Sequence, residues 1–147
     1  MTAIAMPGLF DPLAAVLDLI RRGIAFLATV YTDVGENHTA DVWDGTVSNT
    51  AIAYYIGWGT GTNTAAKGDT ALQTESSETR ATATKSQPSS NVNRHVGTIT
   101  ATGTRVITEA GLFTAVTVGN MLIRGDFSAI NLLSGDSIQF TIDLTWS

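Results

Sequence analysis

The sequence predicts a mainly β protein: a jelly-roll-like β-sandwich with one N-terminal amphipathic helix and an extended N-terminal arm. Three observations lead to this fold class. Residues 137–146 alternate strictly between polar and apolar side chains, as a half-buried strand does. Short β-branched and aromatic runs recur along the chain with turn residues between them. The 147 residues are rich in threonine, and 44% of them are hydrophobic, which suits pleated sheets with a buried face.

The alternating segment is the strongest of these signals. The turn Ser134-Gly135-Asp136 fixes its start. A strand cannot bury such a face alone, so a second layer must cover it. The apolar side chains of that face are Ile138, Phe140, Ile142, Leu144 and Trp146.

The chain begins with ten uncharged, mostly apolar or small residues that are interrupted by Pro7-Gly8. Residues 1–10 are either a frayed terminus or an extended arm, and an apolar arm favours docking on a neighbour because water solvates it poorly. The candidate partner-docking side chains of this arm are Ile4, Met6, Leu9 and Phe10.

An amphipathic helix is expected directly after the arm. Asp11 is a good N-cap, and Pro12 suits the first helical position. Arg21 and Arg22 would lie in the last turn, where they favour the helix dipole, and Gly23 would end the helix. The apolar stripe would consist of Leu13, Val16, Leu17 and Ile20.

The rest of the chain reads as strands and turns, with an arm, helix and lead-in strand over 1–50 and a β-sandwich over 51–147, together one structural unit. A continued helix remains an alternative for the first expected strand. A turn is expected over 33–37, and 39–50 is ambiguous. The expected strands cover 24–31, 51–58, 75–87, 92–102, 104–113 and 121–130.

Composition restricts the function. The net charge of −5, with 14% charged residues, argues against nucleic-acid binding, which needs basic clusters. Cysteine is absent, which excludes disulfides and thiolate metal sites. The apolar stretch 9–30 contains four charges, so it does not predict a membrane span, and the start lacks the basic region of a secretory signal. Low charge with high hydrophobicity fits a chain that hides surface in an assembly, for which we expect a homo-oligomer, although a plain globular fold is also compatible with it.

No motif predicts catalysis, a cofactor or a metal site. Gly57 and Gly59 begin a dinucleotide-binding pattern, but Thr62 replaces its third glycine and no long helix follows. The glycines are therefore expected to let the strand turn sharply. His38, near Asp41, is expected in a surface loop, and His95 on the polar face of a strand.

Among the acids, Glu109 is the most interesting because it lies between apolar residues and beside Gly111, which suggests a bulge. We expect a hydrogen-bonded structural carboxylate there rather than a catalytic acid. Arg124-Gly125-Asp126 spells an integrin-type tripeptide but falls within an expected strand, and Asn37-His38-Thr39 fits a glycosylation acceptor; both are interpreted as chance.

Five segments of the chain occur in a distinctive order and spacing. They are Ile56-Gly57-Trp58-Gly59-Thr60-Gly61-Thr62, Asp69-Thr70-Ala71-Leu72, Ile107-Thr108-Glu109-Ala110-Gly111-Leu112-Phe113, Met121-Leu122-Ile123-Arg124 and Ser134-Gly135-Asp136-Ser137-Ile138. Together they resemble small virion structural proteins of tailed bacteriophages, a group that includes capsid cement and decoration proteins. The resemblance covers about residues 52–147, whereas the first fifty residues match nothing comparable.

The resemblance implies a non-enzymatic capsid cement or decoration protein that lies on the capsid surface of the virion, binds the major capsid protein and stabilises the shell. It implies no enzyme activity, no cofactor and no catalytic residue. Together with the composition, we expect no nucleic acid, no membrane and no small-molecule substrate as partner. Two other functions suit the same fold: a tail, fibre or baseplate component, or a carbohydrate- or receptor-binding β-sandwich. The stacking platform of the last would come from Trp43, Tyr54, Tyr55 or Trp58.

Overall fold

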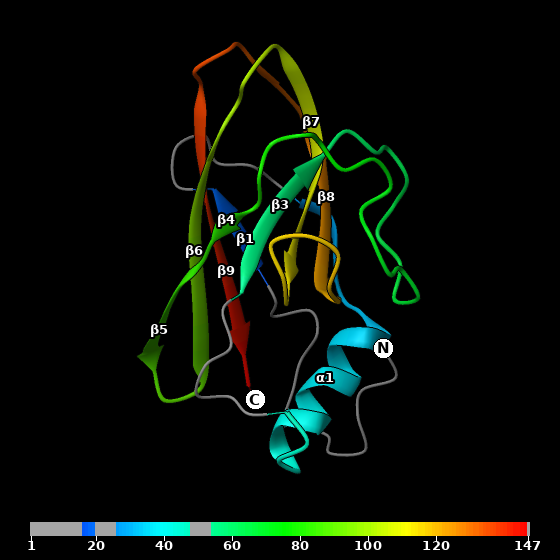
Figure 1. Ribbon diagram of the computed structural model, residues 1–147, viewed down its shortest axis with the longest axis vertical. Helices are drawn as coiled ribbons and strands as arrows, with labels where there is room; N and C mark the ends of the chain where they lie inside the picture. Colours follow the sequence, from blue (N-terminus) through cyan, green and yellow to red (C-terminus); the bar gives the residue numbers. More distant parts are fainter. Residues whose placement is uncertain (1–15, 20–25, 48–53, 147) are drawn as a thin grey trace.

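The computed structural model describes residues 16–19, 26–47 and 54–146, which form two antiparallel sheets and one helix (Figure 1). In chain order the elements are β1 (Val16–Leu19), β2 (Phe26–Tyr31), α1 (Asp33–Trp43), β3 (Tyr55–Gly59), β4 (Ala81–Thr82), β5 (Thr84–Ser89), β6 (Val92–Thr100), β7 (Arg105–Phe113), β8 (Met121–Leu132) and β9 (Ser137–Thr145).

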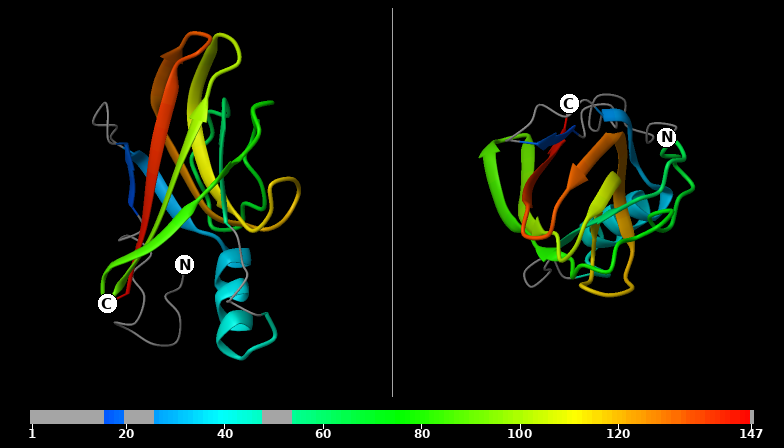
Figure 2. Two further views of the ribbon diagram at one scale, coloured as in Figure 1. Left: turned by 60° about the vertical axis from the view of Figure 1, so that its left-hand side comes forward. Right: turned by 90° about the horizontal axis from the view of Figure 1, so that it is seen from above.

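The two sheets pack face to face as a β-sandwich, which confirms the predicted mainly β architecture. Sheet A has the strand order β1-β9-β6-β5, and sheet B has the order β2-β8-β7-β3-β4. The right-hand view of Figure 2 shows the two layers from above. The left-hand view shows α1 at one end of the sandwich. Strands β1 and β2 come from the first fifty residues, so this part of the chain contributes to both sheets.

Strand β9 confirms the strongest sequence signal. It lies between β1 and β6, and its apolar side chains Ile138, Phe140, Ile142 and Leu144 are all buried. They meet the inner side chains of sheet B in one core, where Phe140 packs against Trp58 with the ring centroids 6.2 Å apart. The alternating pattern therefore marks the centre of the protein.

The expected helix over 11–23 is wrong where the structure describes that segment. Residues Val16–Leu19 form β1 and pair with β9, from Val16 opposite Asp143 to Leu19 opposite Phe140. The physical reason is tertiary: pairing with β9 supplies backbone hydrogen bonds that override a local helical pattern. Residues 11–15 and 20–23 lie outside the described residues.

The helix of the described chain, α1, occupies residues for which we expected a turn and an ambiguous stretch. The side chain of Thr32 caps it by accepting a hydrogen bond from the Gly35 backbone N–H at 3.0 Å. Lys67 forms ion pairs at 2.8 and 3.0 Å with Asp33 and Glu36, which lie in the first turn of α1. Gly35 is suited to this place because a Cβ there would collide with the Leu122 backbone.

The remaining expected strands are confirmed with shifted ends. Strand β2 falls within 24–31, so the continued-helix alternative is wrong for residues 26–31. The polar segment 75–87 holds the short β4 and part of the exposed β5. The pairing of β7 with β8 shifts register between Ile107 and Glu109 and again between Leu112 and Phe113. The extra residues of both shifts lie on β8, so the expected irregularity flanks the Glu109–Gly111 segment and does not lie at Gly111 itself.

Among the residues that the structure describes, no helix is long and apolar enough to cross a membrane.

Candidate functional site

Residues 60–80 connect β3 to β4 and lie against β7 and β8 without forming a regular element of their own. A buried carboxylate and a backbone hydrogen bond help to hold this long connection. The backbone N–H of Ala65 donates to Asp126 at 2.7 Å, and the backbone of Thr60 donates to the Thr74 carbonyl at 2.9 Å. The connection covers sheet B, which explains why every residue from Met121 to Phe127 on β8 is buried.

Glu109 is the centre of this arrangement, and the prediction of a hydrogen-bonded structural carboxylate is confirmed. The side chain is fully buried. Its two oxygens accept backbone N–H groups of Gly61, Gln73 and Thr74 at 2.8–3.0 Å. Arg124 donates to the same carboxylate from Nε at 3.0 Å and from Nη2 at 2.8 Å. Five donors therefore compensate the cost of burying the charge.

Arg124 extends this cluster to the connection. Its Nη1 lies 2.5 Å from Asp69, and its Nη2 lies 2.5 Å from the side-chain oxygen of Asn63. Burial alone would lower the pKa of Arg124, but the hydrogen bonds and charges of Asp69 and Glu109 outweigh it and raise that pKa. We call Glu109, Arg124, Asp69 and Asn63 the Glu109 cluster. The Arg124-Gly125-Asp126 tripeptide is buried within β8, as its predicted strand position implied, and is not an exposed adhesion loop.

Three glycines let neighbouring groups approach closely: Gly57 and Gly59 of β3, and Gly61 directly after it. This is a different role from the sharp turn that we expected. A Cβ on Gly59 or on Gly61 would lie 2.5 Å from Glu109 Oε1, and a Cβ on Gly57 would lie 3.0 Å from Glu75 Oε1. A side chain at Gly59 or Gly61 would therefore displace the connection from the Glu109 carboxylate.

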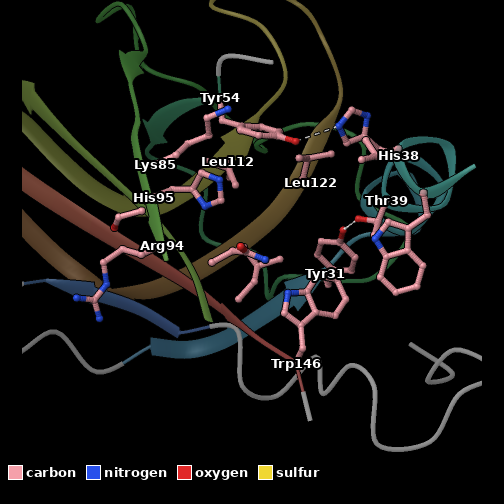
Figure 3. A pocket seen from close by; sticks show the side chains of 15 residues that line it. Tyr31, His38, Thr39, Tyr54, Lys85, Arg94, His95, Leu112, Leu122 and Trp146 are labelled. Carbon is pink, nitrogen blue, oxygen red and sulfur yellow. Dashed lines mark hydrogen bonds between the residues drawn. The ribbon is translucent and has the colours of Figure 1, made fainter. Parts of the chain in front are cut away.

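A second feature is a cavity of about 270 Å³ at one end of the sandwich, which we call the end pocket (Figure 3). Its walls come from α1, from β5, β6 and β9 of sheet A, from β2, β7 and β8 of sheet B, and from Trp146 after β9. It brings together the two histidines, His38 and His95, although 57 positions separate them in the sequence and neither was predicted to be part of a site.

Three rings form a row along the wall of the end pocket. His38 Nε2 and Tyr54 Oη lie 3.4 Å apart, and the two rings meet edge to face. On its other side Tyr54 meets His95 edge to face, with the ring centroids 5.0 Å apart. Figure 3 shows Lys85 beside this row, and its Nζ lies 5.5 Å from the centre of the Tyr54 ring. The row fixes the orientation of the Tyr54 hydroxyl at the cavity.

The expected surface positions of both histidines are wrong. His38 lies within α1 and is buried against Tyr54. His95 is buried because it shares the inner face of β6 with Gly97 and Ile99. The same alternation in the sequence could have placed His95 on the core face, since Ile99 lies four residues further along the strand.

Burial lowers the pKa of His95 to about 4, and nearby Lys85 lowers it further while Asp143 opposes the shift. The unfolded chain therefore takes up this proton near pH 6.5 and the folded chain only near pH 4. The contribution of neutral His95 to stability is complete above pH 6.5 and is lost as the pH falls towards 4.

We expect urea midpoints to fall over this pH range and to fall less steeply in His95→Gln. His38 titrates in the same direction because burial also lowers its pKa, so part of the dependence should persist in the variant. Identical pH profiles for the two proteins would show that His95 contributes nothing to the acid sensitivity.

The four aromatic residues of the carbohydrate-binding alternative do not form one platform. Trp43 and Tyr54 line the end pocket. Trp58 is 1% exposed and donates its Nε1 hydrogen to Glu78, so it belongs to the core. Tyr55 packs instead against the cluster of Leu72, Phe113 and Met121. The residues of the expected partner-docking arm, Ile4, Met6, Leu9 and Phe10, lie outside the described residues.

Within the part of the chain that the structure describes, no three His, Asp or Glu side chains are grouped as metal ligands would be. Its buried acids are instead engaged with backbone and arginine donors, which suits holding the fold. No protein-family model and no curated protein sequence matches this chain.

Proposed function

We propose that this protein is a non-enzymatic virion structural protein, a capsid cement or decoration protein that binds the major capsid protein and stabilises the shell. In this proposal it occupies the capsid surface as a homo-oligomer. The physical task is to cover seams between capsid subunits, for which contact area and multivalency count more than pocket chemistry.

The observation that carries the proposal is the convergence of the segments that resemble phage virion proteins. Four of the five segments meet at the Glu109 cluster: Gly61 and Asp69 come from the first two, and Glu109 and Arg124 come from the next two. Four of the segments that carry the resemblance therefore contribute to the same buried cluster. The Glu109 cluster attaches the connection 60–80 to sheet B, and such a rigid attachment suits a structural protein.

A second observation supports docking through a preformed loop between β7 and β8. Val118 is 86% exposed and has a left-handed backbone, with φ of 57°, which is unfavourable for a β-branched residue. Arg80 holds the loop in this shape by donating to the carbonyls of Ala115 and Val118 at 2.9 and 2.6 Å. Backbone strain that the surrounding structure holds in place often marks a functional segment, so we take the exposed Val118 loop as a candidate contact with the capsid.

The nested strand pairing supports a jelly-roll-like description of the sandwich. The first strand, β1, lies beside the last, β9, in sheet A, and the second strand, β2, lies beside the penultimate β8 in sheet B. We include this topology in the proposal because jelly rolls are frequent in capsid proteins.

Deletion of residues 1–10 tests the expected docking arm. We expect the shortened protein to keep its β-sandwich, as measured by circular dichroism and urea unfolding, and to occupy fewer sites on purified capsids. The reason is that the arm supplies apolar contact area to the partner and no catalytic group. A full-length control, Leu133→Ser, changes an exposed residue of the β8–β9 turn and should bind as the unchanged protein does. Equal occupancy after the deletion would remove the arm from the proposal.

A further inference from the structure

The inner face of sheet A becomes polar where the end pocket begins. Asn93 of β6 lines the pocket and pairs with Leu144 of β9. His95, two residues further along β6, also lines it and pairs with Ile142. Residues directly opposite each other in an antiparallel pair point to the same face, and both partners on β9 belong to the core. Asn93 and His95 therefore occupy core-facing positions, at which apolar side chains are usual.

Most polar groups in the wall of the end pocket are uncharged hydroxyls, imidazoles and an amide. Burial lowers the pKa of both histidines from the ordinary value of 6.5, so both imidazoles are neutral at pH 7. The two cations of the wall are already engaged. Arg94 forms two hydrogen bonds of 2.7 and 2.6 Å with Asp143, and the contacts of Lys85 include the Tyr54 ring, whose centre lies 5.5 Å from Nζ. The wall therefore favours an uncharged ligand with several hydroxyl groups.

His95 shows that the described part of the chain does not complete the hydrogen bonding at this pocket. The residue is 7% exposed, and its Nδ1 has no hydrogen-bond partner among the described residues. Buried polar atoms are nearly always paired, so an unsatisfied nitrogen beside a cavity is unusual for a purely structural role. Tyr54 packs edge to face on the same imidazole, and its hydroxyl oxygen lies 3.4 Å from His38 Nε2. A ligand with hydroxyl groups would add hydrogen-bond partners along this row of rings.

The end pocket also has a flat apolar surface and room for a single ring. Trp43 ends α1 and Trp146 follows β9, and their ring centroids lie 5.8 Å apart with the planes inclined by 37°. Trp43 remains 62% exposed, so its indole offers a face on which the C–H groups of a sugar ring stack. The volume of about 270 Å³ is slightly below the range of about 300–1,000 Å³ that is typical of pockets for drug-sized ligands.

We propose that the end pocket binds one uncharged hexopyranose, a neutral sugar ring. The apolar face of the sugar stacks on Trp43, and its hydroxyls form hydrogen bonds with Tyr54 and Asn93. A purely apolar ring would leave the polar groups of the wall without partners, and an open-chain polyol would present no flat face to the indole. The site binds its ligand without transforming it, and this activity does not depend on the proposed role at the capsid.

The test measures sugar binding to the full-length protein by ligand-observed NMR. The neutral probes are methyl β-D-glucopyranoside, methyl β-D-galactopyranoside and methyl α-D-mannopyranoside, and we expect saturable binding of at least one of them. Cyclohexanol keeps a ring but has a single hydroxyl, whereas sorbitol keeps the hydroxyls but has no ring. Both should bind at least about 10-fold more weakly than the best glycoside, because each lacks one of the two features that the pocket recognises. Methyl β-D-glucuronide should bind no more tightly than the glucopyranoside.

Two variants localise the binding, and a third provides the control. Trp43→Ala should weaken binding of the best glycoside by about 10-fold through loss of the stacking face. Asn93→Ala should weaken it by about 5-fold through loss of amide hydrogen bonds. Leu133→Ala, at an exposed position of similar accessibility to Trp43, should bind as the unchanged protein does, and circular dichroism checks that all three variants are folded.

Four results would each overturn the proposal. They are no saturable binding of any neutral glycoside, binding of cyclohexanol or sorbitol as tight as that of the best glycoside, tighter binding of the glucuronide than of the glucopyranoside, and unchanged binding by folded Trp43→Ala.

Discussion

Replacing Arg124 with leucine is expected to lower the free energy of unfolding by about 3–5 kcal/mol, because removing one partner of a buried ion pair leaves the other charge uncompensated. Glu109 is fully buried and would keep only its three backbone donors. Asp69 and Asn63 would also lose their contacts to the guanidinium group. The long connection over sheet B should loosen as a result.

The matched control is Arg94→Leu, which breaks a cross-strand ion pair with Asp143 near the surface. Their side chains are 39% and 22% exposed, so we expect a loss of at most about 1 kcal/mol. Urea unfolding, followed by circular dichroism, measures both losses. Hydrogen exchange at the backbone amides of Gln73 and Thr74 should also accelerate in Arg124→Leu. Equal losses for the two variants would contradict the central role given to the Glu109 cluster.

Truncating Phe140 to alanine should cost about 3–5 kcal/mol, as buried aromatic truncations commonly do. Phe140 lies on β9, an inner strand of sheet A, and is completely buried. It joins the two sheets, because its ring packs against Trp58 and Phe127 of sheet B at centroid separations of 6.2 and 6.5 Å. A cavity here would therefore separate the layers at their centre.

Val106→Ala is the control for Phe140→Ala, since Val106 is an apolar residue of β7 that remains 47% exposed. We expect its unfolding free energy to change by no more than about 0.5 kcal/mol. Thermal and urea unfolding of both variants measure the difference. A loss below about 1 kcal/mol in Phe140→Ala would mean that the centre of the core lies elsewhere.

The sequence predicted the central strands because their signals are local. Alternation in β9 reports directly which side chains are buried, and the glycine in Ser134-Gly135-Asp136 has the left-handed backbone that its turn requires, with φ of 91°. Glu109 could likewise be recognised as a structural acid, since a carboxylate between apolar residues must find donors. The identity of those donors could not be read, because they come from residues 61, 73, 74 and 124.

The elements that were misassigned depend on distant partners. Residues 16–19 have a helical pattern, but they form a strand because they pair with β9. The residues of α1 resemble a turn because Asp33, Gly35 and Asn37 favour turns. Helix formation there relies on the Thr32 cap, on the ion pair of Lys67 with Asp33 and on close packing of Gly35 against β8. The contacts with Lys67 and β8 form only when distant parts of the chain have come together. The end pocket was missed for the same reason, since its walls meet only after the sheets have paired.

The most direct test of the proposed function is the number of copies of this chain on purified capsids that lack tails. A cement or decoration protein should be present at a copy number comparable to that of the major capsid protein, and a particle reconstruction should show it over the seams between capsid subunits. A handful of copies per particle, or density confined to the tail, would contradict the proposal and favour a tail, fibre or baseplate component.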